Sequence, residues 1–392
     1  MGLLGHMGPE LMFHRLTKRP TAGRLPSGYS GMPVLTTASR YRRVSGALIL
    51  GLLTSACDST PRAISTLLDA FESHPVVALG EGLHGNEQAH QFRLALIRDP
   101  RFARVVNDIV VEFGTSRYQH VMDAFIRGES VPATDLRKTW QDTMKAGAIW
   151  DAPIYEEFFR AVRAVNADLP KDRQLRVLLA DPPIEWEHVH TPQDWIAWNG
   201  RGVAHVANLV RTEVLRRNRR ALLVFGDGHY LRKMEGAFDG DRKPMLTLRN
   251  QIERDDPESV FSIWTNTTAP LELLDNSVSS WPVPRLVAMR GTNLGRLNFS
   301  VIGGIRSKLR VEDQYDAVLY VGPPSSITIS ELPVELCRDE AYMTMRVSRL
   351  AVMPGGAEEV ESFKNSCAQR IRNRRPFTES HRASTGVPES RR

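Results

Sequence analysis

Acids and histidines stand where apolar runs of the sequence end. Glu81 and His84 follow one such run, Glu112 follows a second, and His229 follows a third. A histidine with an ordinary pKa can take a proton from water near neutral pH, and a carboxylate can orient its ring. The pattern therefore predicts a catalytic set of Glu81, His84, Glu112 and His229.

The expected chemistry is the activation of water. His84 would act as general base, while Glu81 or Glu112 orients its ring and stabilises the imidazolium that forms. His229 would act as the acid or bind the developing oxyanion. This chemistry needs no covalent nucleophile, and the sequence contains no Gly-x-Ser-x-Gly segment of the kind that carries a serine nucleophile.

Five further polar residues lie close to these positions or, for Asp181, at the end of another apolar run. We expect them to bind substrate or to support the catalytic set; they are Glu87, Arg93, Asp181, Asp227 and Tyr230. Two of them have simpler explanations. Glu87 falls in the first turn of a predicted helix, where an acid suits the helix dipole, and Asp181 precedes two prolines and could only shape a turn.

The elements that must position these residues alternate along the chain. Apolar runs predict strands, and amphipathic stretches between them predict helices. The runs are apolar throughout, as is typical of parallel strands buried on both faces. The alternation predicts an α/β fold, a doubly wound, mostly parallel sheet covered by helices on both faces. The expected strands are 76–80, 109–111, 175–179, 221–225, 260–264 and 317–321, and the expected helices are 86–97, 118–126, 155–165 and 203–215.

This fold would bring the candidate residues together. In open parallel sheets, ligands bind at the carboxyl ends of the strands. Four of the expected strands end in the acids and histidines named above, so we expect these side chains to meet at one edge. Five tryptophans could line a cleft above this edge or pack a helical cap; they are Trp140, Trp150, Trp186, Trp195 and Trp198.

The segment from Val77 to Gly85, with its Gly-Glu-x-x-His-Gly core, resembles the opening motif of the erythromycin-esterase-like proteins. The wider group also contains the ChaN-type haem-binding lipoproteins and the Tiki/TraB proteases. Glu112 and the later Gly-Asp-Gly-His segment fit the same layout, and the resemblance covers roughly residues 74–325. It implies hydrolysis of an ester, lactone or amide in a small-molecule substrate. One departure is that Glu87 comes one residue earlier than the acid of the family pattern.

Two other functions fit the same residues. A metal-dependent hydrolase could bind Zn or Mn through Glu81, His84 and His229. A ChaN-like domain without hydrolytic activity would instead bind haem, with a histidine or tyrosine as iron ligand. The cofactor is therefore left open between none, a divalent metal and haem.

The start of the chain resembles a bacterial lipoprotein signal. A basic cluster at 40–43 precedes a short apolar run at 46–53, and small residues lead to Cys57. The run is shorter than the roughly 20 residues of a membrane-spanning helix. We expect cleavage before Cys57 and a lipid on its sulfur. Asp58 in the next position resembles lipoproteins kept on the periplasmic side of the inner membrane. The alternative is a buried helix.

The charge pattern argues against nucleic acid as a partner. The formal net charge is +6, but the net positive charge comes from residues 1–56 and 369–392. The part between these ends is net negative. A basic groove that neutralises several phosphates is therefore not expected in the folded part.

We expect three segments. Residues 1–57 form an extension and signal, 58–367 form the α/β domain, and 368–392 form a disordered basic tail. With Cys57 lipidated, Cys337 and Cys367 remain. In an oxidising compartment such a pair predicts one disulfide, and the alternative is two buried thiols.

Overall fold

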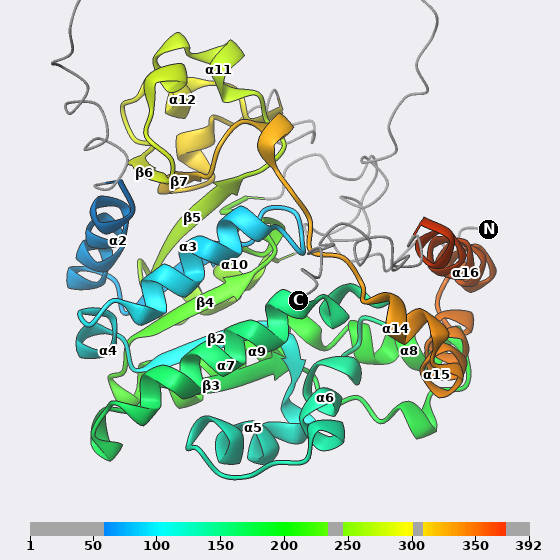
Figure 1. Ribbon diagram of the computed structural model, residues 1–392. Coiled ribbons are helices and arrows are strands. Elements are labelled where there is room, and N and C mark those ends of the chain that lie inside the picture. The colour runs from blue at the N-terminus through cyan, green and yellow to red at the C-terminus, as the bar shows by residue number, and fades with distance from the viewer. Residues whose placement is uncertain (1–58, 234–245, 301–308, 374–392) are drawn as a thin grey trace, which may run out of the picture.

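A seven-stranded sheet forms the centre of the computed structural model, which describes residues 59–233, 246–300 and 309–373 (Figure 1). The strand order is β3-β2-β4-β1-β5-β7-β6, and only β6 runs antiparallel to its neighbour. The predicted α/β fold with a mostly parallel sheet is confirmed. The strands are β1 (Val76–Gly80), β2 (Asp108–Thr115), β3 (Arg176–Asp181), β4 (Ala221–Phe225), β5 (Val260–Asn266), β6 (Arg285–Ala288) and β7 (Ala317–Tyr320).

Helices cover both faces of this sheet. Alternate residues of β1 enter two separate apolar clusters: Val77 and Leu79 pack with one set of helices, and Val76 and Ala78 pack with the other. The first set is α2 (Ser59–Asp69), α3 (Glu87–Arg98), α5 (Gln119–Ile126) and α7 (Pro153–Ala167). The second is α9 (Gly202–Glu213) and α10 (Leu248–Glu253). The sheet is therefore doubly wound, because strands buried on both faces require cover on each.

Two strands differ from the sequence prediction. β2 continues through Glu112 to Thr115, whereas the prediction ended it before Glu112. Its register with β3 shifts between Val111 and Thr115, so the strand is irregular where it carries the acid. β6 was not predicted, because it is a four-residue edge strand with only Leu286 buried and thus lacks a continuous apolar run.

Shorter helices fill the connections. No helix among the residues that the structure describes is both long and apolar enough to cross a membrane. The remaining α-helices are α4 (Phe102–Val105), α6 (Ala133–Gln141), α8 (Pro192–Asn199), α11 (Leu271–Leu274), α12 (Asn293–Arg296), α14 (Val334–Arg338), α15 (Glu340–Ala351) and α16 (Gly356–Asn373).

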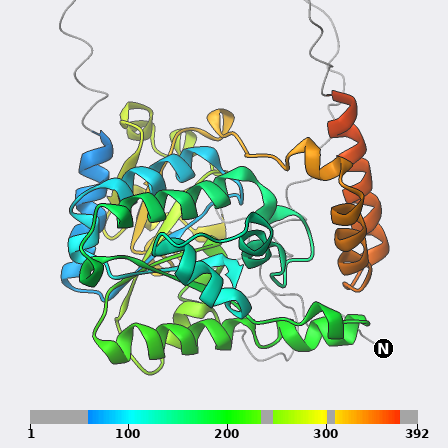
Figure 2. The same ribbon diagram turned by 60° about the horizontal axis from the view of Figure 1, so that its bottom comes forward.

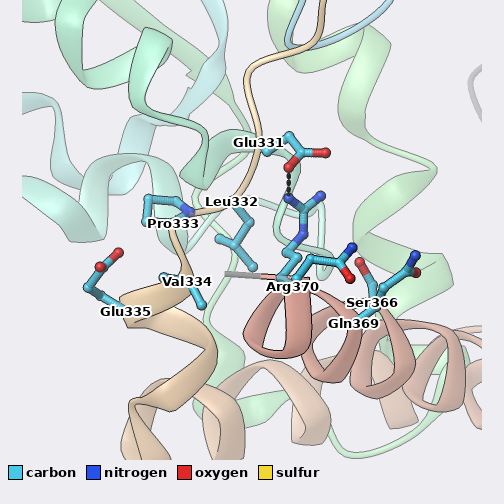
Figure 3. A pocket seen from close by; sticks show the side chains of 9 residues that line it. Glu331, Leu332, Pro333, Val334, Glu335, Ser366, Gln369 and Arg370 are labelled. Atoms are coloured by element: carbon cyan, nitrogen blue, oxygen red, sulfur yellow. Dashed lines mark hydrogen bonds and ion pairs between the residues drawn. The ribbon is translucent and has the colours of Figure 1, made fainter. Parts of the chain in front are cut away.

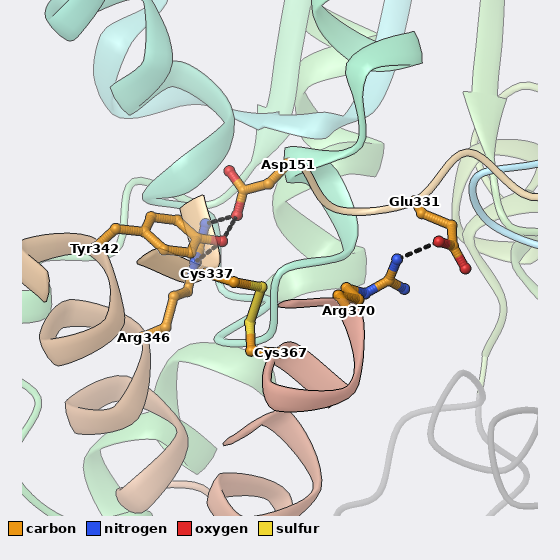
Figure 4. Close-up of a disulfide and its surroundings, with 7 residues drawn as sticks. All are labelled: Asp151, Glu331, Cys337, Tyr342, Arg346, Cys367 and Arg370. Carbon is orange, nitrogen blue, oxygen red and sulfur yellow. Dashed lines mark hydrogen bonds and ion pairs between the residues drawn. A yellow bond between two sulfur atoms is a disulfide. The ribbon is translucent and has the colours of Figure 1, made fainter. Parts of the chain in front are cut away.

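The last three helices form a C-terminal arm, coloured orange to red, which stands beside the sheet layers in Figure 2. A disulfide joins Cys337 to Cys367 and so links α14 to α16 (Figure 4). Asp151 receives hydrogen bonds from Tyr342 and, at 2.6 Å, from Arg346. The Arg346–Asp151 pair is fully buried. These contacts fix the arm to the loop that follows α6.

The structure describes the chain from residue 59 to residue 373 at its two ends. α16 continues to Asn373, so residues 368–373 are helical and the predicted tail boundary at Cys367 is wrong by six positions. Cys57 and the predicted signal lie outside the described residues, as do residues 374–392.

The tryptophans mostly pack rather than line a cleft. Trp195 is buried in a small cluster with Met144 and Ile184. The indole N–H groups of Trp186 and Trp195 donate to the carbonyls of Thr143 and Met144. These contacts form a helical cap over the loop after α6.

Candidate active site at the carboxyl ends of the strands

The loop after β1 folds His84 back onto Glu81. Gly82 and Gly85 both have positive φ, +69° and +80°, a region that glycine enters without the steric penalty of a Cβ. Asn86 then caps α3 by accepting the N–H of Ala89. This compact turn brings Nδ1 of His84 to 2.8 Å from Oε2 of Glu81.

The Glu81 side of this pair is rigidly enclosed. Glu81 is only 1% exposed, and Arg93 from α3 lies 3.4 Å from its other carboxylate oxygen and is itself 2% exposed. Tyr155 accepts the backbone N–H of Gly85 at 2.9 Å. The predicted supporting residue Arg93 therefore does reach the site, as the partner of Glu81.

Trp150 holds the His84 ring from another side. The two rings meet edge to face, with centroids 4.7 Å apart. Trp150 also contacts Tyr155 and precedes Asp151, which anchors the C-terminal arm. The His84 ring is thus fixed by a carboxylate at one nitrogen and an indole against its face, which limits its rotation.

A second acid–histidine pair lies on the neighbouring strands. Oε1 of Glu112 on β2 is 3.6 Å from Nε2 of His229, which sits in the turn after β4. The other carboxylate oxygen of Glu112 accepts the N–H of Gly226 at 2.9 Å. Glu112 and His229 are mostly buried. The four residues that the sequence pointed to are therefore gathered at one sheet edge.

The charges at the site favour an ionised acid beside a basic histidine. Burial lowers the pKa of His84, but the hydrogen bond and charge of Glu81 and the charge of Glu112 outweigh burial and hold it above its ordinary value of 6.5. Burial raises the pKa of Glu112, but His229, His84 and the Gly226 N–H together hold it below its ordinary value. Both shifts arise because opposite charges lie close together in a dry site.

Asp227, in the turn after β4, forms hydrogen bonds to the loop after β1 and to β5. Its carboxylate accepts the N–H of Thr265 on β5 at 3.1 Å and also that of Gly82. A Cβ on Gly80 would lie 1.7 Å from Oδ1 of Asp227, so only glycine allows this approach. Burial raises the pKa of Asp227 to about 7, against the effect of these N–H groups. Asp227 is thus a positioning residue for the β1 loop.

The other predicted supporting residues have different surroundings. Asp181 accepts the N–H of Met144 at 2.7 Å, and burial holds its pKa well above its ordinary value. Tyr230 is 1% exposed and lies among the acids of the site. Glu87 instead accepts the hydroxyl of Thr328 at 2.6 Å in an exposed position. The prediction for Glu87 is not supported, because the helix cap at Asn86 turns it toward the segment after β7.

Sequence reasoning missed residues that helices and loops supply. Tyr155 and Thr265 hold the β1 loop, yet both stand in stretches whose periodicity only indicates packing. His90 on α3 is 3.0 Å from Glu157, and burial together with the charge of Arg93 lowers its pKa to about 4. Lys145 lies near Asp181, and burial lowers its pKa to about 8. No motif in the sequence marks these four positions.

Three side chains could hold a metal ion. Glu81, His84 and Glu112 each offer one ligand atom, and these atoms lie within 4.8 Å of one another. The sequence had pointed to His229 in place of Glu112. Carboxylate and imidazole ligands suit Zn or Mn. The described surroundings of His84 combine two acids, Glu81 and Glu112, with the aromatic ring of Trp150.

A hollow lies away from these residues. It has a volume of about 510 Å³ and is bounded by Glu331–Glu335 and by Ser366, Gln369 and Arg370 of α16 (Figure 3). Glu331 and Arg370 form an exposed ion pair at its edge. The hollow shares no lining residue with the acid–histidine site, and we assign no catalytic role to it.

Comparison with known proteins supports the fold. No protein-family model and no curated protein matches the chain. A succinoglycan biosynthesis protein of known structure matches with a TM-score of 0.50 and 9% identity, over 69% of this chain and 92% of that one. A mutant of the erythromycin esterase EreC in its open conformation matches with 0.48 and 12%, over 68% and 94%. A Bacillus cereus protein matches with 0.46 and 10%, over 70% and 95%. At such identities, what the chain shares with the succinoglycan biosynthesis protein is its fold.

Proposed function

We propose that this protein is a hydrolase that activates water against an ester, lactone or amide in a small-molecule substrate. The observation that carries the proposal is the 2.8 Å contact between His84 and the buried Glu81. A buried carboxylate that orients a histidine is the arrangement that general-base catalysis requires. The motif around these residues, which resembles that of the erythromycin-esterase-like proteins, points to the same reaction class.

The geometry assigns a role to each ring nitrogen of His84. Glu81 accepts a hydrogen bond from the protonated Nδ1, so the unprotonated Nε2 is left to take a proton from water. As the water oxygen bonds to the substrate carbonyl carbon, the proton moves to Nε2 and Glu81 stabilises the imidazolium. His229 would then donate a proton to the leaving oxygen or nitrogen as its bond to the carbonyl carbon breaks. Glu112 keeps that histidine in place.

Unpaired polar atoms favour a polar substrate. Buried atoms at the site without a hydrogen-bond partner among the described residues are Nη1 of Arg93, Nε1 of Trp150 and Oη of Tyr230. Buried polar atoms are rarely left unpaired without a functional reason. Several such atoms around one histidine suit a substrate that carries hydroxyl or carbonyl groups.

An activity screen tests the proposal. The full chain would be assayed on a panel of esters, lactones and amides, beside His84→Ala and, as matched control, Glu87→Gln. We expect turnover by the wild type and the control, and none by His84→Ala. Equal turnover by His84→Ala would contradict the proposal.

A metal-dependent form of the reaction is the second candidate. It is favoured by the proximity of ligand atoms on Glu81, His84 and Glu112. A bound ion would lower the pKa of a coordinated water and so supply hydroxide. The same screen, run after chelation and after addition of Zn or Mn, distinguishes the two. Activity that survives chelation, with no metal found by elemental analysis, selects the metal-free reaction.

We also propose that the protein is exported and held by a lipid on Cys57 at the periplasmic side of the inner membrane. The basic cluster, apolar run and small residues before Cys57 support this, as does the Cys337–Cys367 disulfide, which is typical of oxidising compartments. Mass spectrometry of the N-terminal peptide tests it. We expect a diacylglyceryl group on Cys57, absent in Cys57→Ser, and an unmodified cysteine would contradict the proposal.

A further inference from the structure

The folded domain begins beside an exposed loop. α2 starts at Ser59 and packs against β6, and the Ser59 hydroxyl donates to the carbonyl of Val283 at 3.0 Å. Only Asp58 separates Ser59 from Cys57. Two residues span at most about 7 Å of chain. A lipid on Cys57 would therefore leave the protein close to Val283.

The surface around this point carries exposed apolar side chains. Leu273 on α11 is 81% exposed and Val283 is 49% exposed. Both belong to segments that meet at Tyr320: its ring contacts Trp281 at 5.8 Å, and its hydroxyl bonds to Glu272. Among the described residues, Leu273 is the most exposed large hydrophobic side chain, and nothing in the fold accounts for its exposure.

An aromatic ring and basic side chains accompany the apolar residues of this surface. The guanidinium of Arg285 lies 4.9 Å from the centre of the half-buried Trp281 ring, and Arg62 on α2 is exposed. Two acids lie nearby: Glu272 accepts the Tyr320 hydroxyl and Asp275 accepts the N–H of Ser277. Tryptophan, leucine and arginine together are typical of surfaces that lie in the membrane interface.

We propose that the surface formed by Leu273, Trp281, Val283 and Arg285 rests on the lipid bilayer that holds the Cys57 anchor. The inference rests on the proposed lipid anchor and goes beyond it, because it fixes which face of the domain meets the membrane. A single lipid attachment leaves a protein free to rotate, whereas apolar contacts beside it select one orientation.

This orientation has a consequence for the site. β6 is the edge strand, and β1 lies three strands further into the sheet. At strand spacings of about 4.8 Å, His84 would stand roughly 14 Å from the membrane-facing edge.

Site-directed fluorescence tests the surface. The lipidated full chain, with an environment-sensitive nitrobenzoxadiazole label on Leu273→Cys, would be reconstituted into vesicles of phosphatidylethanolamine and phosphatidylglycerol. The matched control carries the label on Glu129→Cys, which is also exposed and lies in the turn after α5, far from α11 in Figure 1. We expect a severalfold rise in emission with a blue shift at position 273 and neither change at position 129.

A second measurement distinguishes failure of the proposed membrane surface from failure of the proposed lipid anchor. Mass spectrometry of the same preparation reports the lipid on Cys57. If the lipid is present and the labels at 273 and 129 respond equally, the anchor stands and the proposed surface is wrong. If the lipid is absent, both proposals fail. A parallel label on Val283→Cys should respond like that on position 273, and an unchanged emission there would also overturn the inference.

Discussion

The site contains two acid–histidine pairs that are built in different ways. His84 and Glu81 stand three residues apart in one loop, 2.8 Å from each other, and Arg93, Trp150 and Tyr155 enclose them. His229 and Glu112 come from separate strands and lie 3.6 Å apart.

For the proposed hydrolase, the difference suits the two pairs to different roles. A base must hold one ring tautomer from the start, and the short, buried contact to Glu81 provides this. A proton donor to the leaving group must follow atoms that move during the reaction, so a longer contact is compatible with its role. In the proposed mechanism the first pair would therefore be the rigid part and the second the adjustable part.

Removal of the two histidines should have unequal effects. We expect His84→Gln to lower kcat/KM by about 10³-fold and His229→Gln by about 10²-fold, both within the range of general acid–base catalysis. Steady-state kinetics on the best substrate of the screen would measure this. A larger loss for His229→Gln would reverse the assignment of base and acid.

Replacing each acid by its neutral amide should lower activity, and the loss should be larger for the His84 pair than for the His229 pair. Glu81→Gln keeps the shape of the side chain but removes the charge that holds the Nδ1 proton, and we expect kcat to fall by about 10²-fold. Glu112→Gln should have a smaller effect, because its contact with His229 is longer. KM should change little in either variant, and an effect confined to KM would indicate substrate binding instead.

The pH dependence should report His84. The reaction needs the neutral ring, so the rate should fall as pH decreases through the pKa of His84, which lies above 6.5. In Glu81→Gln the main raising influence is lost, and the midpoint should move to lower pH. If the midpoint of the pH–rate profile is unchanged in Glu81→Gln, a group other than His84 controls the loss of rate at low pH.

Gly80→Ala should destabilise the loop that carries the first pair. Its Cβ would overlap Asp227, and overpacking of this kind costs about 1–3 kcal/mol of unfolding free energy. Asp227→Asn keeps an acceptor oxygen and should fold.

Asp227 also predicts a trend in stability. Because burial raises its pKa from 3.8 to about 7, its contribution is complete below pH 3.8 and is lost as pH rises through about 7. Chemical denaturation from pH 4 to 8 would show a falling stability in the wild type. The decline should be weaker in Asp227→Asn, and an identical decline would contradict this explanation.

The smallest effect on activity and stability is expected for Glu87→Gln, which lies outside both acid–histidine pairs. Glu87→Gln retains an oxygen that can accept the Thr328 hydroxyl, so activity and stability should stay within about 0.5 kcal/mol of the wild type. The same assays and melts measure this. A large loss of activity would place Glu87 in the reaction and restore the role that its sequence position first suggested.

The ends of the strands could be predicted because each strand is marked by a short, continuous apolar run in the sequence. β4 was predicted with its observed bounds, and a parallel sheet brings its carboxyl ends to one edge. The enclosure of His84 could not be predicted, since Trp150 and Tyr155 reach it from about 70 residues away in the chain. The 30-residue gap between Cys337 and Cys367 likewise gives no indication that the pair joins α14 to α16 within a C-terminal arm.

The most direct test of the central claim needs no substrate. Selective ¹⁵N labelling of the histidines, with His84→Gln for assignment, would report the tautomer and pKa of His84 by NMR. Our account predicts a neutral ring protonated at Nδ1, a pKa above 6.5, and a lower pKa in Glu81→Gln. A ring protonated at Nε2, or a pKa that Glu81→Gln leaves unchanged, would contradict the claim that Glu81 prepares His84 to activate water.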